Sequence, residues 1–139
     1  MTDLVFVYGT LTDDAQVAAL LDSYRFVGDA VCVGLRRVDG RHPTLVPGES
    51  VGGRLLETSE IDRLDRYEGV DRGLYHRVSV PLASSLAATV SATTASVYFA
   101  APSDLGLGSL DQYWPGEGCF TDRIDRHLET THIERINEK

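Results

Sequence analysis

The sequence predicts an α+β domain built on a mixed, curled sheet. Several segments have the pattern of strands, helical segments stand between only some of them, and residues 26–57 hold strand segments with no helix between them. A strictly parallel α/β sheet needs a crossover helix between successive strands, so this region argues against one. The chain has 139 residues, which fits a single domain over residues 1–139.

The N-terminal segments predict a buried strand followed by a helix. Residues 4–8 form a continuous apolar run that ends at Gly9, as is typical of a buried strand. Asp13 can cap the first turn of a helix, and Gln16 completes the spacing of a capping box. Apolar residues then recur at helical spacing up to Tyr24.

The next segments predict strands separated by turns, and then a second helix. Residues 26–38 are rich in valine and predict one or two strands interrupted by glycines, whereas residues 41–43 and 47–49 have the composition of turns. Residues 51–57 predict a further strand. The second helix is expected to begin at Thr58 or Ser59 and to end at Gly69, a left-handed C-terminal cap.

The C-terminal half predicts two more strands and a terminal helix. Residues 75–82 alternate in the manner of a half-buried strand, and residues 95–100 predict the last strand. The Ala/Ser/Thr-rich residues 83–94 are expected to form a hairpin loop or an exposed extension. Residues 102–118 are expected to be irregular, and residues 121 to about 136 are expected to form a polar helix.

The charge balance excludes several classes of partner. The net charge is −8 and the pI is about 4.8, and no basic stripe is present that could offset nucleic-acid phosphates or an acidic membrane surface. No apolar run approaches the roughly 20 residues that cross a bilayer. The N-terminus lacks the basic region of a secretory signal. We therefore expect a soluble cytoplasmic protein with neither a nucleic-acid nor a membrane partner.

The types of charged residue suggest adaptation to salt. Lys139 is the only lysine beside twelve arginines, and aspartates outnumber glutamates thirteen to eight. Many aspartates with almost no lysine give a strongly hydrated surface that stays soluble when salt screens charge. A halophilic source and a merely acidic cytosolic protein both fit this composition. The sequence leaves the oligomeric state open.

Neither cysteine nor histidine spacing predicts a metal site. Cys32 and Cys119 are too few and too far apart for a disulfide scaffold or a zinc site, and the four histidines lack metal-ligand spacing. No serine stands in a nucleophile elbow, and no phosphate-binding or dinucleotide-binding motif is present.

The turn Tyr8-Gly9-Thr10-Leu11 is a candidate anion-binding loop. It connects the first strand to a helix, and we expect Gly9 to turn the backbone with a positive φ and to let a ligand approach closely. Backbone N–H groups in such a loop can converge on an anion. An ordinary tight turn between two elements would have the same sequence.

Glu68 is the strongest candidate for acid/base chemistry. It follows Ile61 by seven residues, so it lies on the same core-facing stripe after about two helical turns. Desolvation and the negative end of the helix should both raise the pKa of a carboxyl placed there. No basic residue at helical spacing offsets this, although Arg72 or Arg77 could reach it in the fold. A frayed glutamate that points to solvent is the alternative.

Three further residues are weaker candidates. Tyr75 and Arg77 share one face of the predicted strand after Glu68; Tyr75 could donate to a substrate or to Glu68, and Arg77 could pair with a carboxylate. For Arg77, a solvated sheet face is the simpler interpretation. Trp114, beside Tyr113, could line a pocket, but packing in the core is the commoner role of such a residue.

Three segments together resemble the γ-glutamylcyclotransferase-like family, and most closely its AIG2-like and γ-glutamylamine cyclotransferase branch. They are Val7-Tyr8-Gly9-Thr10-Leu11, Leu64-Asp65-Arg66-Tyr67-Glu68-Gly69 and Leu74-Tyr75-His76-Arg77-Val78-Ser79-Val80. Their order and spacing match over residues 4 to about 100, and the resemblance fades from residue 101 onward. Members of the amine branch often carry a basic residue right after the first segment, where Thr12 and Asp13 stand here.

The resemblance implies a small mixed β-barrel with flanking helices and a specific reaction. In similar enzymes the α-amine of a γ-glutamyl group attacks its own γ-carbonyl, which gives 5-oxoproline and a free amine. The resemblance makes Tyr8 to Leu11 the substrate-holding loop and Glu68 the proton carrier. It implies a small-molecule γ-glutamyl substrate and neither metal nor cofactor. A carboxylate-binding protein of the same fold without turnover, or an acidic interaction domain without a pocket, are the alternatives.

Overall fold

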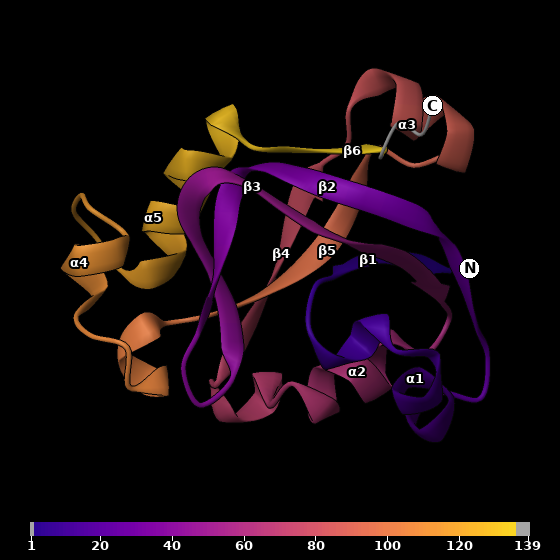
Figure 1. Ribbon diagram of the computed structural model, residues 1–139, viewed down its shortest axis with the longest axis horizontal. Helices are drawn as coiled ribbons and strands as arrows, with labels where there is room; N and C mark the ends of the chain where they lie inside the picture. The colour runs from indigo at the N-terminus through magenta and orange to yellow at the C-terminus, as the bar shows by residue number, and fades with distance from the viewer. Residues whose placement is uncertain (1, 136–139) are drawn as a thin grey trace.

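A single mixed sheet of six strands forms the framework of the chain. The computed structural model describes residues 2–135, and the strand order in the sheet is β4-β5-β1-β3-β2-β6 (Figure 1). β1 and β5 are parallel, whereas every other neighbouring pair is antiparallel, which confirms the predicted α+β class with a mixed sheet. The strands are β1 (Asp3–Val7), β2 (Tyr24–Asp39), β3 (Pro43–Thr58), β4 (Tyr75–Pro81), β5 (Thr94–Ala100) and β6 (His132–Arg135).

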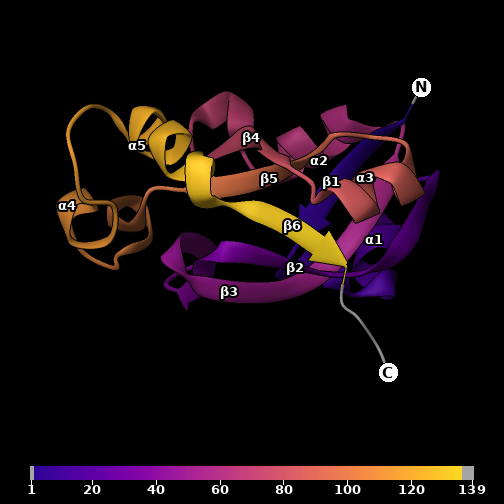
Figure 2. The ribbon, with the colours of Figure 1, turned by 90° about the horizontal axis from the view of Figure 1, so that it is seen from above.

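The two edges of the sheet meet at one end, so that the sheet curls into a partly closed barrel. Leu82, just after β4, forms an isolated parallel bridge with Ile133 of β6. The backbone N–H of Ala83 donates to the Ile133 carbonyl at 2.8 Å. Figure 2 shows β6 running from the end of α5 (Phe120–His127) towards α3 (Ser84–Val90), which covers this end. Closure of this kind protects strand edges that would otherwise remain unpaired.

The helices divide into groups around the sheet (Figure 1). α1 (Asp14–Leu20) and α2 (Ile61–Tyr67) lie together at one end, and α4 (Leu110–Tyr113) and α5 lie at the other. Short 3₁₀ turns complete the connections: η1 (Thr10–Thr12), η2 (Val70–Arg72), η3 (Pro102–Leu105) and η4 (Leu128–Thr130). No helix among residues 2–135 is long and apolar enough to cross a membrane.

The core consists of two apolar clusters on opposite faces of β1. Val5 and Val7 belong to the cluster that packs under α1 and α2, and Phe6 belongs to the cluster inside the curled sheet. This division follows from the alternation of side chains along a strand. Trp114 is 1% exposed and fills the inner cluster against Phe99.

The long hairpin of β2 and β3 bends sharply, and its distal half turns towards the site. The pairing register shifts between Val33 and Leu35, and Gly34 has a φ of +105° at this bulge. A side chain at Gly34 would meet the Thr130 carbonyl at 2.9 Å, so both the conformation and the space require glycine. The hairpin tip is held by the Arg41 N–H, which donates to the Leu105 carbonyl.

Several elements differ from the sequence-based predictions. Residues 47–49 do not form a turn but continue β3 through the bulge. Residues 83–94 do not form a loop, because Leu86 is buried against the core and anchors the helix α3. The predicted terminal helix ends at His127; the chain then pairs as β6 with β2, and residue 136 lies outside the described residues.

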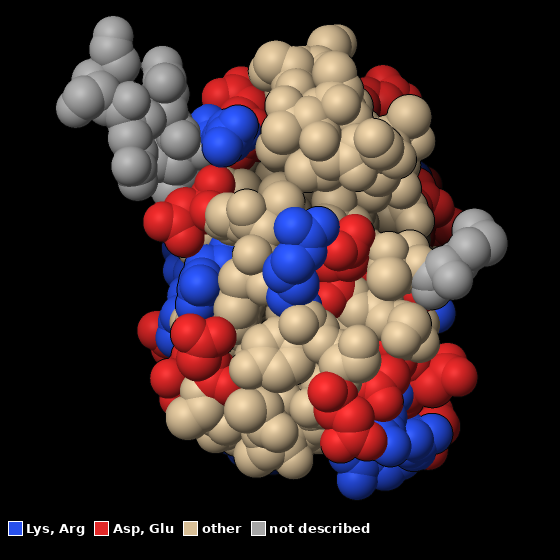
Figure 3. Space-filling view, turned by 90° about the vertical axis from the view of Figure 1, so that its right-hand side faces the viewer, with Lys and Arg blue, Asp and Glu red and all other residues tan. Residues whose placement is uncertain are grey.

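One face of the molecule is markedly less charged where α3 lies. Figure 3 shows tan side chains at the top of this face, and red and blue side chains interspersed below. Residues 82–96 contain no charged side chain, which accounts for this difference.

Candidate active site

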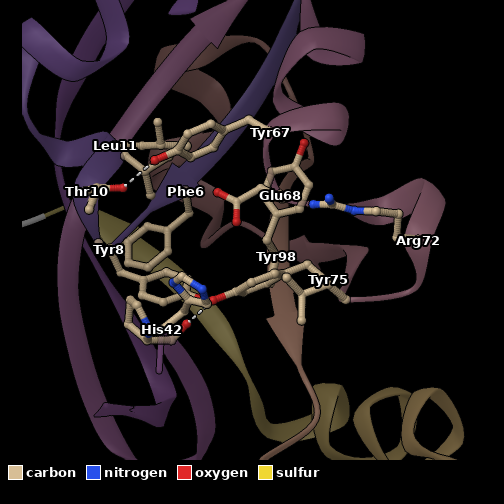
Figure 4. Close-up of a pocket in the computed structure, with 14 residues that line it drawn as sticks. Phe6, Tyr8, Thr10, Leu11, His42, Tyr67, Glu68, Arg72, Tyr75 and Tyr98 are labelled. Atoms are coloured by element: carbon tan, nitrogen blue, oxygen red, sulfur yellow. Dashed lines mark hydrogen bonds between the residues drawn. The ribbon is translucent and has the colours of Figure 1, made fainter. Parts of the chain in front are cut away.

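A pocket of about 310 Å³ opens where β1 ends and α2 ends. It collects residues from both core clusters and from the tip of the β2–β3 hairpin (Figure 4). Most of its wall surface is apolar or aromatic, as is common for small-molecule sites, although several lining side chains also carry polar groups. The lining residues are Phe6, Val7, Tyr8, Gly9, Thr10, Leu11, His42, Pro43, Tyr67, Glu68, Arg72, Leu74, Tyr75 and Tyr98.

The Glu68 carboxyl points into this pocket (Figure 4). Glu68 is the C-terminal cap of α2, whose buried residues Ile61 and Leu64 fix the helix face that turns inward. Gly69 follows with a φ of +73°, so the helix stops in the left-handed cap that the sequence predicts. Because the helix ends here, the Glu68 carboxyl lies at the pocket.

Burial raises the pKa of the Glu68 carboxyl from the ordinary value of 4.5 to about 7. Desolvation is the cause, because the charged form loses water that nothing else replaces. Among the described residues, none donates a hydrogen bond to this carboxyl and none forms an ion pair with it. Arg77, which the sequence offered as a partner, instead binds Asp65 at 2.9 Å.

The tyrosine hydroxyl groups around Glu68 are bound to other acceptors. Tyr8 donates to the Tyr98 carbonyl at 2.5 Å, Tyr75 donates to the Pro43 carbonyl at 2.5 Å, and Tyr98 donates to Asp65 at 2.7 Å. Burial is the main cause that raises the pKa of each of these three hydroxyls. The rings therefore act as fixed, neutral walls.

Four carbonyl groups of the loop after β1, those of Tyr8, Gly9, Thr10 and Thr12, accept hydrogen bonds. The Gly9 carbonyl accepts from the N–H of Thr12 at 3.0 Å and from its hydroxyl at 2.7 Å. The Arg37 side chain donates to the Tyr8 carbonyl at 2.7 Å, and the Arg54 side chain donates to the Thr12 carbonyl at 2.9 Å. The backbone N–H of Asp13 donates to the Thr10 carbonyl at 3.2 Å. These contacts restrain the directions of the four peptide units to which the carbonyls belong.

The N–H groups of the same loop are free. Within residues 2–135, no acceptor is found for the backbone N–H of Gly9, Thr10 or Leu11. The first N–H groups of any helical turn lack internal partners, and η1 begins at Thr10. All three residues line the same pocket as Glu68.

Gly9 does not have the positive φ that the sequence analysis expects. Its φ is −123° and its ψ is −131°. The space at this position is tight, because a Cβ would lie 3.1 Å from Cγ of Pro43. The hairpin tip thus lies directly against the loop.

Two of the weaker candidates lie outside the pocket lining. Arg77 is on β4 and its side chain reaches Asp65, and Trp114 is enclosed by Phe99, Phe120 and His127. Tyr75 does line the pocket, together with Glu68 and the loop.

Sequence reasoning missed three lining residues that carry polar groups, His42, Tyr67 and Tyr98, and it named Arg72 only as a side chain that could reach Glu68. Tyr67 directly precedes Glu68, and Tyr98 lies on a predicted strand, so a search for clustered tyrosines could have found both. His42 and Arg72 lie in a hairpin tip and a short 3₁₀ turn, where no periodicity indicates direction.

The fold and the pocket together define a class of protein. It is a curled, mixed α+β domain with a small pocket, whose lining includes the loop after β1 and a single carboxyl with its pKa raised to about 7 by burial. A carboxyl of this kind can both accept and donate a proton at neutral pH.

Comparisons with known proteins identify the family. The family model "Gamma-glutamyl cyclotransferase, AIG2-like" matches residues 5–116, so the chain belongs to this family. No curated protein matches the chain at the level that counts as significant.

Solved structures share the fold. An uncharacterized protein from Homo sapiens has a TM-score of 0.61 at 18% identity, over 92% of this chain and 98% of that one. A protein from Arabidopsis thaliana, solved in solution, has a TM-score of 0.56 at 25% identity, over 92% and 84% of the two chains. A structure named "Gamma-glutamyl cyclotransferase" has a TM-score of 0.58 at 16% identity, over 93% and 99%.

Proposed function

We propose that the protein is an enzyme that cyclises the γ-glutamyl group of a γ-glutamyl amine or short γ-glutamyl peptide. The products are 5-oxoproline and a free amine. The observation that carries this proposal is the Glu68 carboxyl, which lines the pocket opposite free loop amides and has its pKa raised to about 7 by burial. Membership of the γ-glutamyl cyclotransferase, AIG2-like family supports the reaction class.

The reaction requires proton transfer between two nitrogens. The α-ammonium of the substrate must lose a proton before its nitrogen can attack the γ-carbonyl carbon. A C–N bond to this nitrogen forms and the C–N bond to the leaving amine breaks. The product ring keeps one of the three ammonium protons, and the leaving amine gains the other two. In the proposed mechanism Glu68 carries protons from the attacking nitrogen to the leaving nitrogen.

A pKa of about 7 suits Glu68 to both halves of this task. At neutral pH about half of the carboxyl groups are ionised and can accept, and a protonated group gives its proton up readily. A glutamate at the ordinary value of 4.5 would be a weaker base for the ammonium group. The absence of a hydrogen-bond donor to Glu68 among residues 2–135 favours this role, because such a donor would lower its basicity.

In this proposal the free amides of the loop hold negative charge. The N–H groups of Gly9, Thr10 and Leu11 would bind the substrate carboxylate or the oxygen of the reacting carbonyl. Because the carbonyls of the loop are bound elsewhere, the amides need no rearrangement when the substrate arrives. Ring closure is intramolecular, so correct positioning supplies much of the rate acceleration.

An assay of 5-oxoproline formation tests the proposal. A panel of γ-glutamyl amines and γ-glutamyl dipeptides is incubated with wild type, Glu68→Gln and the control Glu129→Gln. Glu129 is exposed on η4, away from the pocket. We expect Glu68→Gln to lower kcat by about 10²- to 10⁴-fold while the fold survives, and Glu129→Gln to match wild type.

Two outcomes would contradict the proposal in different ways. If Glu68→Gln cyclises substrate as fast as wild type, the role of Glu68 is wrong. If wild type binds γ-glutamyl compounds but forms no 5-oxoproline from any of them, the protein is a binding protein of this fold and not an enzyme.

A further inference from the structure

The pocket mouth carries a cationic side chain that the proposed ring closure does not use. Arg72 belongs to the 3₁₀ turn η2 and lines the same pocket as Glu68. In Figure 4 it enters the site from the side opposite Thr10 and Leu11. The Arg72 side chain makes no hydrogen bond and no ion pair with any residue between 2 and 135, so the five N–H donors of its guanidinium are free for a ligand.

The local backbone holds Arg72 at this place. Gly69 and Gly73 flank η2 with φ values of +73° and +77°, which fixes a tight turn directly after α2. The guanidinium folds back over Gly69, where a Cβ would lie 2.8 Å from its Nη2 atom. Its side chain therefore lies across the start of the turn that follows Glu68.

Arg72 does not neutralise Glu68. The two side chains form no ion pair, and desolvation alone determines the shift of the Glu68 pKa. The guanidinium charge is thus available to something other than the proton carrier.

The charge of the rest of the molecule makes this position significant. The chain has a net charge of −8, which repels anionic ligands at a distance. Among the lining residues, Glu68 is the only acid, whereas Arg72 and His42 are basic. The pocket lining therefore has one arginine to its one acid, whereas in the whole chain 21 acidic residues outnumber 13 lysines and arginines.

We infer that Arg72 selects substrates whose amine portion carries a carboxylate. This inference rests on the proposed function: the loop amides hold the γ-glutamyl part on one wall, and Arg72 binds the anionic end of the departing group at the opposite wall. A guanidinium can bind a carboxylate through two parallel hydrogen bonds, which a neutral amide cannot match. A γ-glutamyl amino acid is then preferred to a γ-glutamyl conjugate of a neutral or cationic amine.

A pair of matched substrates tests the inference. γ-Glutamyl-alanine and γ-glutamyl-alaninamide differ only in the charge of the terminal group. We expect wild type to prefer the acid by roughly 5- to 50-fold in kcat/KM, and Arg72→Gln to bring this ratio close to one. The change should come from the acid, while turnover of the amide stays within about twofold.

Two further variants distinguish direct binding of the carboxylate by Arg72 from an effect of the protein's net charge. Arg66→Gln removes the same charge from the exposed face of α2, where no contact with another described residue is lost, and should keep the wild-type ratio. Arg72→Lys keeps the charge but loses the bidentate geometry, so it should retain part of the preference. Added salt should reduce the preference in wild type, because Arg72 is exposed.

Several results would overturn the inference while leaving the cyclisation intact. Wild type could show no preference for the acid, or Arg72→Gln could slow both substrates equally, which would assign Arg72 to the γ-glutamyl part. If no compound is turned over, the proposed function fails. The role of Arg72 is then tested separately, by calorimetric measurement of how tightly wild type and Arg72→Gln bind the same two compounds. Tighter binding of the acid than of the amide by wild type, lost in Arg72→Gln, supports the inference. Equal affinity of wild type for the two compounds overturns it.

Discussion

Glu68 is an ordinary glutamate whose position changes its acidity. Its pKa rises from 4.5 to about 7 because the carboxyl lies in a pocket of aromatic walls. The tyrosine hydroxyls nearby donate to other groups, and the loop amides lie free for a ligand. The charged carboxylate is thus less stable here than in water, which makes it a stronger base than an ordinary glutamate.

Glu68→Gln should stabilise the protein at alkaline pH. The folded-state pKa lies above the ordinary value, so the folded protein holds the proton longer than the unfolded chain does. Its stability therefore falls as pH rises from about 4.5 to about 7, and the loss remains complete above that range. Glutamine removes this loss, which amounts to at most about 3 kcal/mol.

Chemical unfolding of both proteins at several pH values measures this effect. The free energy of unfolding of Glu68→Gln should exceed that of wild type at about pH 8 and should approach it near pH 4.5. Glu129→Gln serves as control, and its free energy of unfolding should not diverge from that of wild type as pH rises. A difference between the two proteins that does not change with pH would contradict the burial of this carboxyl.

The candidate residues show which part of a site can be predicted from sequence. Glu68 could be placed on the core-facing stripe because Ile61 lies two helical turns before it. That spacing gives a face of the helix, but it does not say what lies across from it. His42 reaches the pocket only because the β2–β3 hairpin bends at Gly34, and nothing in its local sequence encodes that distant effect.

Strand β3 illustrates how two adjacent glycines can have different roles. Gly53 faces β1, where a Cβ would lie 2.3 Å from the Val7 carbonyl and 2.8 Å from Cζ of Phe6. A Cβ at Gly52 would meet nothing within 4 Å. The close approach at Gly53 lets β1 end in the position from which the loop leaves.

Gly53→Ala and Gly52→Ala should therefore differ in stability. We expect Gly53→Ala to lower the free energy of unfolding by about 1–3 kcal/mol, because the backbone or Phe6 must shift. Gly52→Ala should stay within about 1 kcal/mol of wild type. Urea denaturation of the three proteins measures both values. Equal destabilisation by the two changes would show that the close approach at Gly53 is wrong.

Elements with strong periodicity could be predicted, whereas elements that depend on distant partners could not. The segments 4–8, 75–82 and 95–100 are strands within a residue or two of the predicted bounds. Residues 83–94 hold few large side chains, so the burial of Leu86 that anchors α3 could not be anticipated. β6 exists because β2 offers an edge to pair with, which the local sequence of residues 132–135 does not reveal.

The net charge of the whole molecule should make its stability depend on salt. A net charge of −8 on a chain of 139 residues produces repulsion between carboxylates that salt can screen. The sequence-based hypothesis of a salt-adapted protein therefore predicts that the melting temperature rises in molar KCl. Sucrose at equal osmolality is the control for general exclusion from the surface. A melting temperature unchanged by KCl, or raised only as much as by sucrose, would contradict salt adaptation.

The curled sheet brings together the parts of the site from distant segments. The loop follows β1, the carboxyl follows α2, and Tyr75 and Tyr98 come from the antiparallel pair β4 and β5. The pocket thus depends on how the elements pack across the sheet. The pKa of Glu68 is a measure of that packing, because burial in the pocket is what raises it.

The titration of the Glu68 carboxyl tests the central claim most directly. Its ¹³C resonance, assigned by comparison with Glu68→Gln, is followed by NMR from about pH 3 to about pH 9. The pocket described above predicts a midpoint at about 7. A midpoint near the ordinary value of 4.5 would mean that the carboxyl is solvated, and it would contradict the proposed role of Glu68 as the proton carrier.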